Sequence, residues 1–120
     1  MSDEPEEIIV IYKRPGEDAY VTSIRKGLKP MQSLVDGSIE MMAGRVVGLS
    51  PIIDVWFNEE GKLHNMEPNL NLVCEGERFD ILVGPAFFTA HNKKGETLEL
   101  PKEFHEEVFA FCKEHKWRGR

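Results

Sequence analysis

Residues 81–90 read Ile-Leu-Val-Gly-Pro-Ala-Phe-Phe-Thr-Ala and carry the strongest strand signal in the chain. Large apolar and β-branched residues, which suit strands, stand on both sides of Gly84-Pro85. Because proline has no N–H to donate to a sheet ladder, we expect a bulge or a sheet edge at that point. Phe87 and Phe88 are neighbours and therefore face opposite sides of the strand. The stretch predicts a sheet with large apolar groups on both faces.

Further strand signals lie on both sides of this stretch. Residues 8–12 are a continuous β-branched and aromatic run, and residues 19–24 form a second one. The Arg-Pro-Gly-Glu-Asp turn at residues 14–18 separates them, so we predict an N-terminal hairpin. Residues 66–72 contain Pro68 and remain open between a strand and a short irregular segment. The other strands are expected over residues 39–42, 46–49, 52–57 and 97–100.

Two segments have the apolar periodicity of helices. Residues 28–35 place four apolar side chains on one helical face, with Pro30 in the first turn and Gly37 just past the end. A second stripe follows Pro101 and contains Phe104, Val108, Phe111, Cys112 and His115. The sequence therefore predicts an α+β fold. Its sheet is small and mixed or antiparallel, with one short helix and a C-terminal amphipathic helix packed on it.

Length and charge set the class of protein. A chain of 120 residues forms one ordinary domain, which we place at residues 8–118 between an acidic tail (1–7) and a frayed end (119–120). The net charge of −6 argues against general nucleic-acid binding and against binding to anionic membranes. The acidic start does not resemble a secretory signal, and Cys74 and Cys112 suit a reducing compartment. We therefore expect a cytoplasmic protein.

Four short strings stand out along the chain: LVDGSIE at 34–40, NEEGKL at 58–63, PN at 68–69 and DILVG at 80–84. Their order and spacing resemble a family of small phage, plasmid and Firmicutes proteins, a domain of unknown function (DUF3846). The resemblance covers about residues 8–98 and does not include the C-terminal helix. It departs at Asp36-Gly37, where the family usually has two glycines. The resemblance implies a mobile-element gene among accessory or anti-restriction genes, and it implies no established chemistry.

The sequence contains no recognisable catalytic motif. It lacks the nucleophile elbow, the Walker loop, the dinucleotide-binding fingerprint and the zinc-protease helix motif. Cys112 and His115 are one helical turn apart and would supply half of a metal site, but the plainer interpretation puts Cys112 in the core and His115 at the helix edge. The pairs Glu59-Glu60 and Glu106-Glu107 point apart and are interpreted as solvated charges. We expect no enzyme, no metal and no cofactor.

A candidate binding site lies where the second strand leads into the first helix. Helix starts favour phosphate through free N–H groups, and a glycine lets the backbone approach closely. The competing interpretation is a solvated loop that keeps a sheet edge soluble. An aromatic side chain and two amides, which can bind a base or cap a turn, complete the set. The predicted ligand-binding residues are Arg25, Lys26, Gly27, Lys29, Trp56, Asn58 and Asn69.

Three functional hypotheses follow. The first is a non-catalytic binding protein of a phage or mobile element, in the form of an oligomeric sponge that sequesters a phosphorylated nucleotide signal of host immunity. The second is an acidic protein-binding inhibitor or DNA mimic that acts on a host restriction or nuclease system. The third is a small nucleotide hydrolase. A homo-oligomer is expected because Trp56-Phe57 and Phe87-Phe88 place large apolar groups on both sheet faces.

Overall fold

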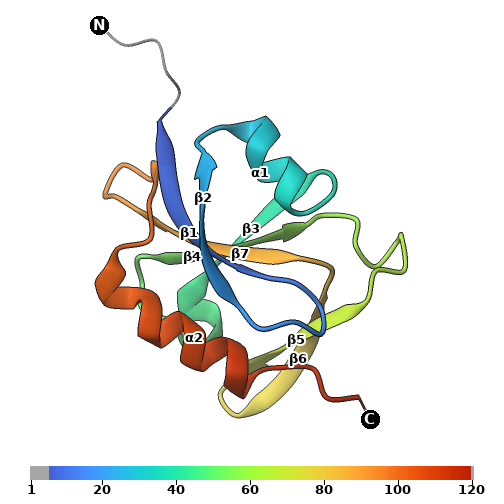
Figure 1. Cartoon of the computed structure of the whole chain (residues 1–120). Helices are drawn as coiled ribbons and strands as arrows, with labels where there is room; N and C mark the ends of the chain where they lie inside the picture. Colours follow the sequence, from blue (N-terminus) through green and yellow to red (C-terminus); the bar gives the residue numbers. More distant parts are fainter. Residues whose placement is uncertain (1–5, 120) are drawn as a thin grey trace, which may run out of the picture.

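The computed structural model describes residues 6–119 and contains two antiparallel sheets (Figure 1). The larger sheet has the strand order β2-β1-β7-β4-β3, and β8 pairs with β7. Strands β5 and β6 form a separate two-stranded sheet. The α+β fold predicted from the sequence is confirmed. The strands are β1 (Glu7–Lys13), β2 (Tyr20–Arg25), β3 (Ile39–Ala43), β4 (Ile53–Asn58), β5 (Pro68–Cys74), β6 (Glu77–Val83), β7 (Ala86–His91) and β8 (Thr97–Leu98).

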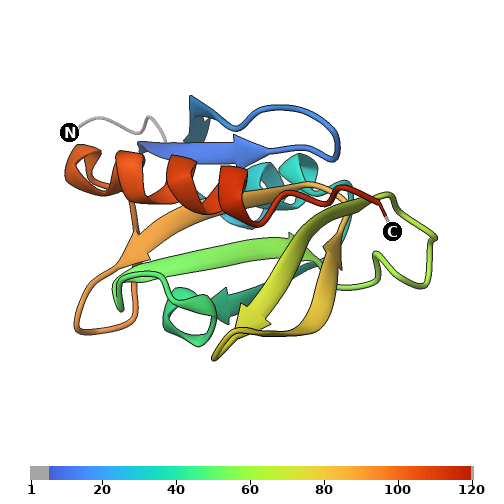
Figure 2. The ribbon, with the colours of Figure 1, turned by 90° about the horizontal axis from the view of Figure 1, so that it is seen from below.

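Helices cover the two faces of the larger sheet. Helix α1 (Leu28–Leu34) packs Met31 against the face that carries Phe87. Helix α2 (His105–Glu114) packs against the face that carries Phe88, together with the β5–β6 sheet (Figure 2). A short 3-10 helix, Lys102–Phe104, precedes α2, and another, Gly44–Val47, follows β3. None of the helices in residues 6–119 is long and apolar enough to cross a membrane.

The two phenylalanines of β7 show how the chain fills both faces. Phe87 and Phe88 are each fully buried, on opposite sides of the sheet. Phe87 stacks on Trp56 with the ring centres 6.0 Å apart, and Phe88 meets Phe111 of α2 edge-on at the same separation. Helices of the same chain therefore cover both apolar faces. Of the four aromatic residues from which we expected an oligomer, Phe87 and Phe88 are buried within one protomer and Trp56 and Phe57 are half-buried. The homo-oligomer stays a prediction.

The segment at residues 46–49 differs from its prediction. It was expected to be a strand, but Gly44–Val47 form a 3-10 helix that ends at Gly48 with φ of +89°. The chain has to reverse here between the antiparallel neighbours β3 and β4. A β-carbon on Gly44 would lie 2.5 Å from the carbonyl oxygen of Ile53, so only glycine allows this close approach. The tight connection between β3 and β4 therefore decides the structure of this segment, although its residues have a high propensity for strands.

The stretch at residues 81–90 divides at Gly84-Pro85 into β6 and β7, which belong to different sheets. We expected one interrupted strand with a bulge or an edge at this point. Gly84 has a φ of +77°, a left-handed conformation that glycine adopts without strain. The undecided segment at residues 66–72 lies mainly in strand β5. Its outer edge is covered by the end of the chain, because Asn71 N–H donates to the carbonyl of His115 at 2.7 Å.

The turn at Asp36-Gly37 has a positive φ at both positions. Asp36 has a φ of +60° and Gly37 a φ of +155°. Both values favour glycine, so a pair of glycines would suit this turn. At the N-terminus, residues 1–5 of the predicted tail lie outside the described residues, whereas Glu7 already belongs to β1.

Candidate functional site

A cleft of about 510 Å³ opens between β3 and β4 on one side and β6 on the other. The loop of residues 59–63, which follows β4, forms part of the wall of this cleft. Figure 2 shows that the β5–β6 sheet runs at an angle to the larger sheet. The residues that line the cleft come from both sheets and from the loop that follows β4. We call this cavity the β3–β6 cleft.

Exposed apolar side chains line the β3–β6 cleft. Met41 of β3 is 47% exposed, Phe79 of β6 is 51% exposed, and Leu63 of the loop is 73% exposed. Single exposed apolar side chains are ordinary on a protein surface, but a group of them in one concave place is typical of a contact surface. The β3–β6 cleft therefore offers apolar area that a partner can bury.

Two strands with a free edge border the same cleft. Strand β3 is the last strand of the larger sheet, and β6 pairs only with β5 among the described residues. By contrast, the free side of β5 is closed by the chain end, through a bridge between Leu70 and Lys116. An unpaired strand edge presents N–H and C=O groups that another extended segment can pair with.

The charge of the cleft lining is mainly negative. Four carboxylates stand against one ammonium, and Lys62 forms an ion pair with Asp80. Partial burial would by itself raise the pKa of Asp80, but hydrogen bonds from Lys62 and from the Ile81 N–H lower it below its usual value. Asp80 therefore stays ionised, and three carboxylates remain for a ligand. The four carboxylates are Glu40, Glu59, Glu60 and Asp80.

A buried amide fixes the start of the loop that closes the cleft. Asn58 donates from Nδ2 to the carbonyl of Val35 at 2.9 Å and accepts the Glu60 N–H at Oδ1 at 2.7 Å. Further along, Gly61 approaches β6 so closely that a β-carbon would lie 2.9 Å from Cγ2 of Val83. The wall of the cleft is therefore held in place before any ligand binds.

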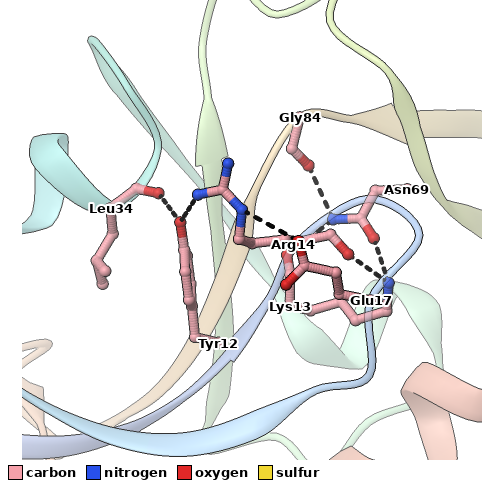
Figure 3. A network of polar contacts seen from close by, with 7 residues as sticks. All are labelled: Tyr12, Lys13, Arg14, Glu17, Leu34, Asn69 and Gly84. Atoms are coloured by element: carbon pink, nitrogen blue, oxygen red, sulfur yellow. Dashed lines mark hydrogen bonds and ion pairs between the residues drawn. The ribbon is translucent and has the colours of Figure 1, made fainter.

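A second polar region surrounds Lys13 at the end of β1 (Figure 3). Its side chain is only 2% exposed, and Nζ donates to the carbonyl of Arg14 at 2.7 Å and to Oδ1 of Asn69 at 2.8 Å. Asn69 in turn donates to the carbonyls of Lys13 and Gly84, at 2.9 and 2.8 Å. This network joins β1 to β5 and to the β6–β7 connection.

The same network continues on the α1 side (Figure 3). The Tyr12 hydroxyl donates to the carbonyl of Leu34 at 2.6 Å and accepts a hydrogen bond from Arg14 at 3.1 Å. Arg14 also forms an ion pair with Glu17, with 3.8 Å between Nε and Oε2. Burial raises the pKa of the Tyr12 hydroxyl, which keeps it protonated as a donor. These contacts fix the turn that follows β1.

Lys13 also lines a small pocket of about 230 Å³ between this turn and α2. Lys113 and Lys116 of the C-terminal region contribute two further ammonium groups, and Glu17 and Asp18 contribute two carboxylates. Three neutral side chains complete the lining: Ala19, Phe109 and Cys112. We call this cavity the lysine pocket.

The strongest catalytic geometry outside these cavities is a carboxylate–imidazole pair. Oδ2 of buried Asp54 lies 2.9 Å from Nδ1 of His91, and Trp56 Nε1 donates to Thr89 Oγ1 nearby on the same two strands at 2.8 Å. Neither Asp54 nor His91 lines the β3–β6 cleft or the lysine pocket. A substrate bound in either cavity would therefore not contact this pair.

The remaining candidates for chemistry have structural contacts. Cys112 is buried in the core, as the plainer interpretation predicted. The ring of His115 lies tilted against that of Phe111, and its Nδ1 is 3.1 Å from the Asn71 carbonyl oxygen. Glu107 was expected to be a solvated charge, but its two carboxylate oxygens accept hydrogen bonds from the Ser50 N–H and hydroxyl, each at 2.7 Å. It faces the β3–β4 connection because α2 packs beside it.

The predicted basic residues lie together at the β2–α1 junction. Arg25 ends β2, Lys26 forms an ion pair with Glu6 at 3.9 Å, and Lys29 lies in the first turn of α1. Gly27 precedes the helix with a φ of +144°, a conformation that favours glycine. The helix has only seven residues, so its dipole is short.

The other predicted site residues are distributed over the fold. Trp56 packs in the cluster beside α1, Asn58 holds the loop at the cleft, and Asn69 holds Lys13. Asn58 and Asn69 therefore use their amides within the chain. Among residues 6–119, no side-chain hydrogen bond or ion pair joins these three residues to Arg25, Lys26 or Lys29, although Trp56 packs in the same cluster as Ile24 and Met31. Of the three, only Asn58 lines the β3–β6 cleft.

Sequence reasoning missed the residues that define the two cavities. Met41 falls within an expected strand, whereas Phe79 and Lys13 lie just outside the expected strands, and none of the three is among the predicted site residues. One signal for Lys13 was available in the sequence. It directly follows an apolar run of five residues, so the strand that buries this run can bury the lysine side chain as well. No local signal identified Met41 and Phe79 as lining residues of one cavity, because β3 and β6 belong to different sheets.

Comparisons with known proteins give one match. The family model described as a domain of unknown function (DUF3846) matches residues 8–113. This range extends beyond residue 98 and includes most of α2, which the sequence resemblance had left outside. No curated protein matches, and no solved structure matches. The chain therefore belongs to the DUF3846 family.

Proposed function

We propose that this chain is a non-catalytic binding protein that holds an extended, apolar and positively charged segment of a partner protein in the β3–β6 cleft. One observation carries this proposal: a single cleft combines free strand edges, exposed apolar side chains and an excess of carboxylates. It is a specific form of the acidic protein-binding alternative that the sequence leaves open. The net charge of the chain, −6, is opposite in sign to that of a cationic partner and would attract it.

Each part of the lining favours the same kind of ligand. An extended segment beside β3 or β6 would pair its main chain with the free edge, which supplies affinity independent of side chains. Apolar side chains at alternate positions would cover Met41, Leu63 and Phe79. Lysine or arginine at the other positions would face Glu40, Glu59 and Glu60.

The test uses a fluorescein-labelled peptide of about nine residues that alternates lysine with valine or isoleucine, long enough to follow one strand. Fluorescence polarisation is expected to give a Kd of about 1–100 µM, which should weaken as salt is raised. A matched peptide with glutamate in place of lysine should not bind. Met41→Lys and Phe79→Lys should each abolish binding because they place a cation in the apolar lining.

Leu28→Lys is the matched control, because Leu28 is also an exposed apolar residue, on α1 and outside the cleft. Its binding should equal that of the wild type. Equal binding of the acidic and basic peptides, or unchanged binding by both cleft variants, would contradict the proposal.

Nucleotide sequestration by an oligomeric sponge of mobile-element origin is the second proposal. It is supported by the adjacency of Arg25, Lys26 and Lys29 at the β2–α1 junction. A thermal-shift screen with cyclic dinucleotides and ADP-ribose derivatives, with light scattering on the same samples, tests it. Stabilisation of an assembly larger than the 13.7 kDa monomer supports this proposal, whereas an unshifted monomer contradicts it.

A further inference from the structure

We propose that the lysine pocket is a binding site for one small anion, a phosphate or carboxylate group, held by Lys13, Lys113 and Lys116. This site is separate from the β3–β6 cleft and does not depend on the peptide proposal, because the two cavities share no lining residue. A volume of about 230 Å³ suits a single phosphate or carboxylate group and is small for a whole nucleotide.

The first support is the hydrogen bonding of Lys13. An ammonium group has three N–H donors, and Nζ uses two of them on the Arg14 carbonyl and the Asn69 side chain. Both acceptors are neutral. Among residues 6–119 the structure gives Nζ neither a third acceptor nor an ion pair.

The second support is the cost of this arrangement. A side chain that is only 2% exposed carries a charge whose hydrogen-bond partners do not neutralise it. Burial lowers the pKa of Lys13, and the charge of Lys116 acts in the same direction. Cys112, Asp18 and Glu17 raise this pKa but do not reverse the shift, so the ammonium form is disfavoured. An anion in the pocket would supply the missing acceptor and the missing charge together.

The third support is the charge of the lining. Lys13, Lys113 and Lys116 outnumber Glu17 and Asp18. Glu17 is already paired with Arg14, and Glu17 and Asp18 are both exposed to solvent. Lys113 and Lys116 make no side-chain ion pair among the described residues, so both ammonium groups are available at the rim.

The test is calorimetric titration of the full chain with inorganic phosphate and, in a second arm, with acetate, at constant ionic strength in chloride. Saturable binding of phosphate alone identifies a phosphoryl ligand, and equal binding of acetate identifies a carboxylate ligand. The double variant Lys113→Gln/Lys116→Gln changes only the rim and should weaken binding about tenfold or more.

Lys93→Gln/Lys94→Gln is the matched control, because it removes two exposed lysines from the β7–β8 turn, outside the pocket. It should bind as the wild type does. Lys13→Met should abolish binding. The proposal is overturned if neither anion binds at millimolar concentration, or if the rim variant and the control weaken binding equally.

Discussion

The β3–β6 cleft and the lysine pocket differ in the sign of their charges and in how far those charges are buried. In the cleft, carboxylates surround an apolar lining in which Phe79 and Leu63 remain largely exposed. In the lysine pocket, the ammonium of Lys13 is buried and depends on Asn69 for a hydrogen bond. A buried polar group without its partner costs far more than an exposed one. The folded state therefore depends on the hydrogen bonds that Lys13 makes, whereas the exposed side chains of the cleft lining contribute little to stability.

The largest expected effect is the loss of the amide that serves the lysine pocket. Asn69→Leu would remove an acceptor from Lys13 Nζ and a donor from the carbonyls of Lys13 and Gly84. We expect the free energy of unfolding in urea to fall by about 3 kcal/mol, because breaking such a buried network leaves a charge uncompensated.

The double variant Lys13→Met/Asn69→Leu is the control for this prediction. It removes the buried charge together with its partner, so it should recover part of the lost stability and reveal coupling between the two sites. A loss below about 1 kcal/mol for Asn69→Leu alone would show that the network is dispensable.

The difference between the two cavities also decides what the sequence could predict. The hairpin β1–β2, the short helix after Gly27 and the C-terminal helix follow from local periodicity and turn residues, and the structure agrees. The 3-10 helix at Gly44–Val47 does not follow from them, because the need to connect β3 to β4 overrides the propensity of two valines.

The sites were harder to predict than the elements. The phosphate hypothesis used residues that are adjacent in the sequence, Arg25 to Lys29, whereas both cavities combine residues from distant segments. Lys13 and Lys116 are about one hundred positions apart and meet because the chain end covers β5. The strand order decides which distant residues become neighbours, and the local patterns of a single sequence do not predict the strand order.

An intermediate effect is expected from the thiol of the lysine pocket. Burial raises the pKa of Cys112 from 9.0 to about 12, so between these values the folded state keeps a proton that the unfolded state releases. Stability from this group is full below pH 9 and falls as the pH rises toward 12. Cys112→Ala should remove this loss, and its stability relative to wild type should increase by about 2 kcal/mol between pH 8.5 and 10.5.

Lys13 is present in both proteins, and its lowered pKa gives a slope of the opposite sign. Because the charge of Cys112 raises the pKa of Lys13 in the wild type, the comparison reports the thiol together with its effect on Lys13. As the pH rises, Lys13 loses its proton at a lower pH in the folded state than in the unfolded state. The contribution of Lys13 to the free energy of unfolding therefore rises with pH up to about 10.5 in both proteins. Urea unfolding at each pH provides the measurement. Parallel stability curves for the two proteins would show that Cys112 is not shielded from water.

The smallest effect on stability is expected in the β3–β6 cleft. Leu63 is 73% exposed, so Leu63→Ala should change the free energy of unfolding by less than about 0.5 kcal/mol. The same change should weaken binding of the basic peptide about fivefold, because the truncated side chain covers less apolar area in the complex. Leu28→Ala, a change at another exposed leucine outside the cleft, should alter neither quantity. If Leu63→Ala lowered stability as much as Asn69→Leu does, the cleft would be part of the folding core, and its exposed apolar lining would no longer indicate a site kept for a partner.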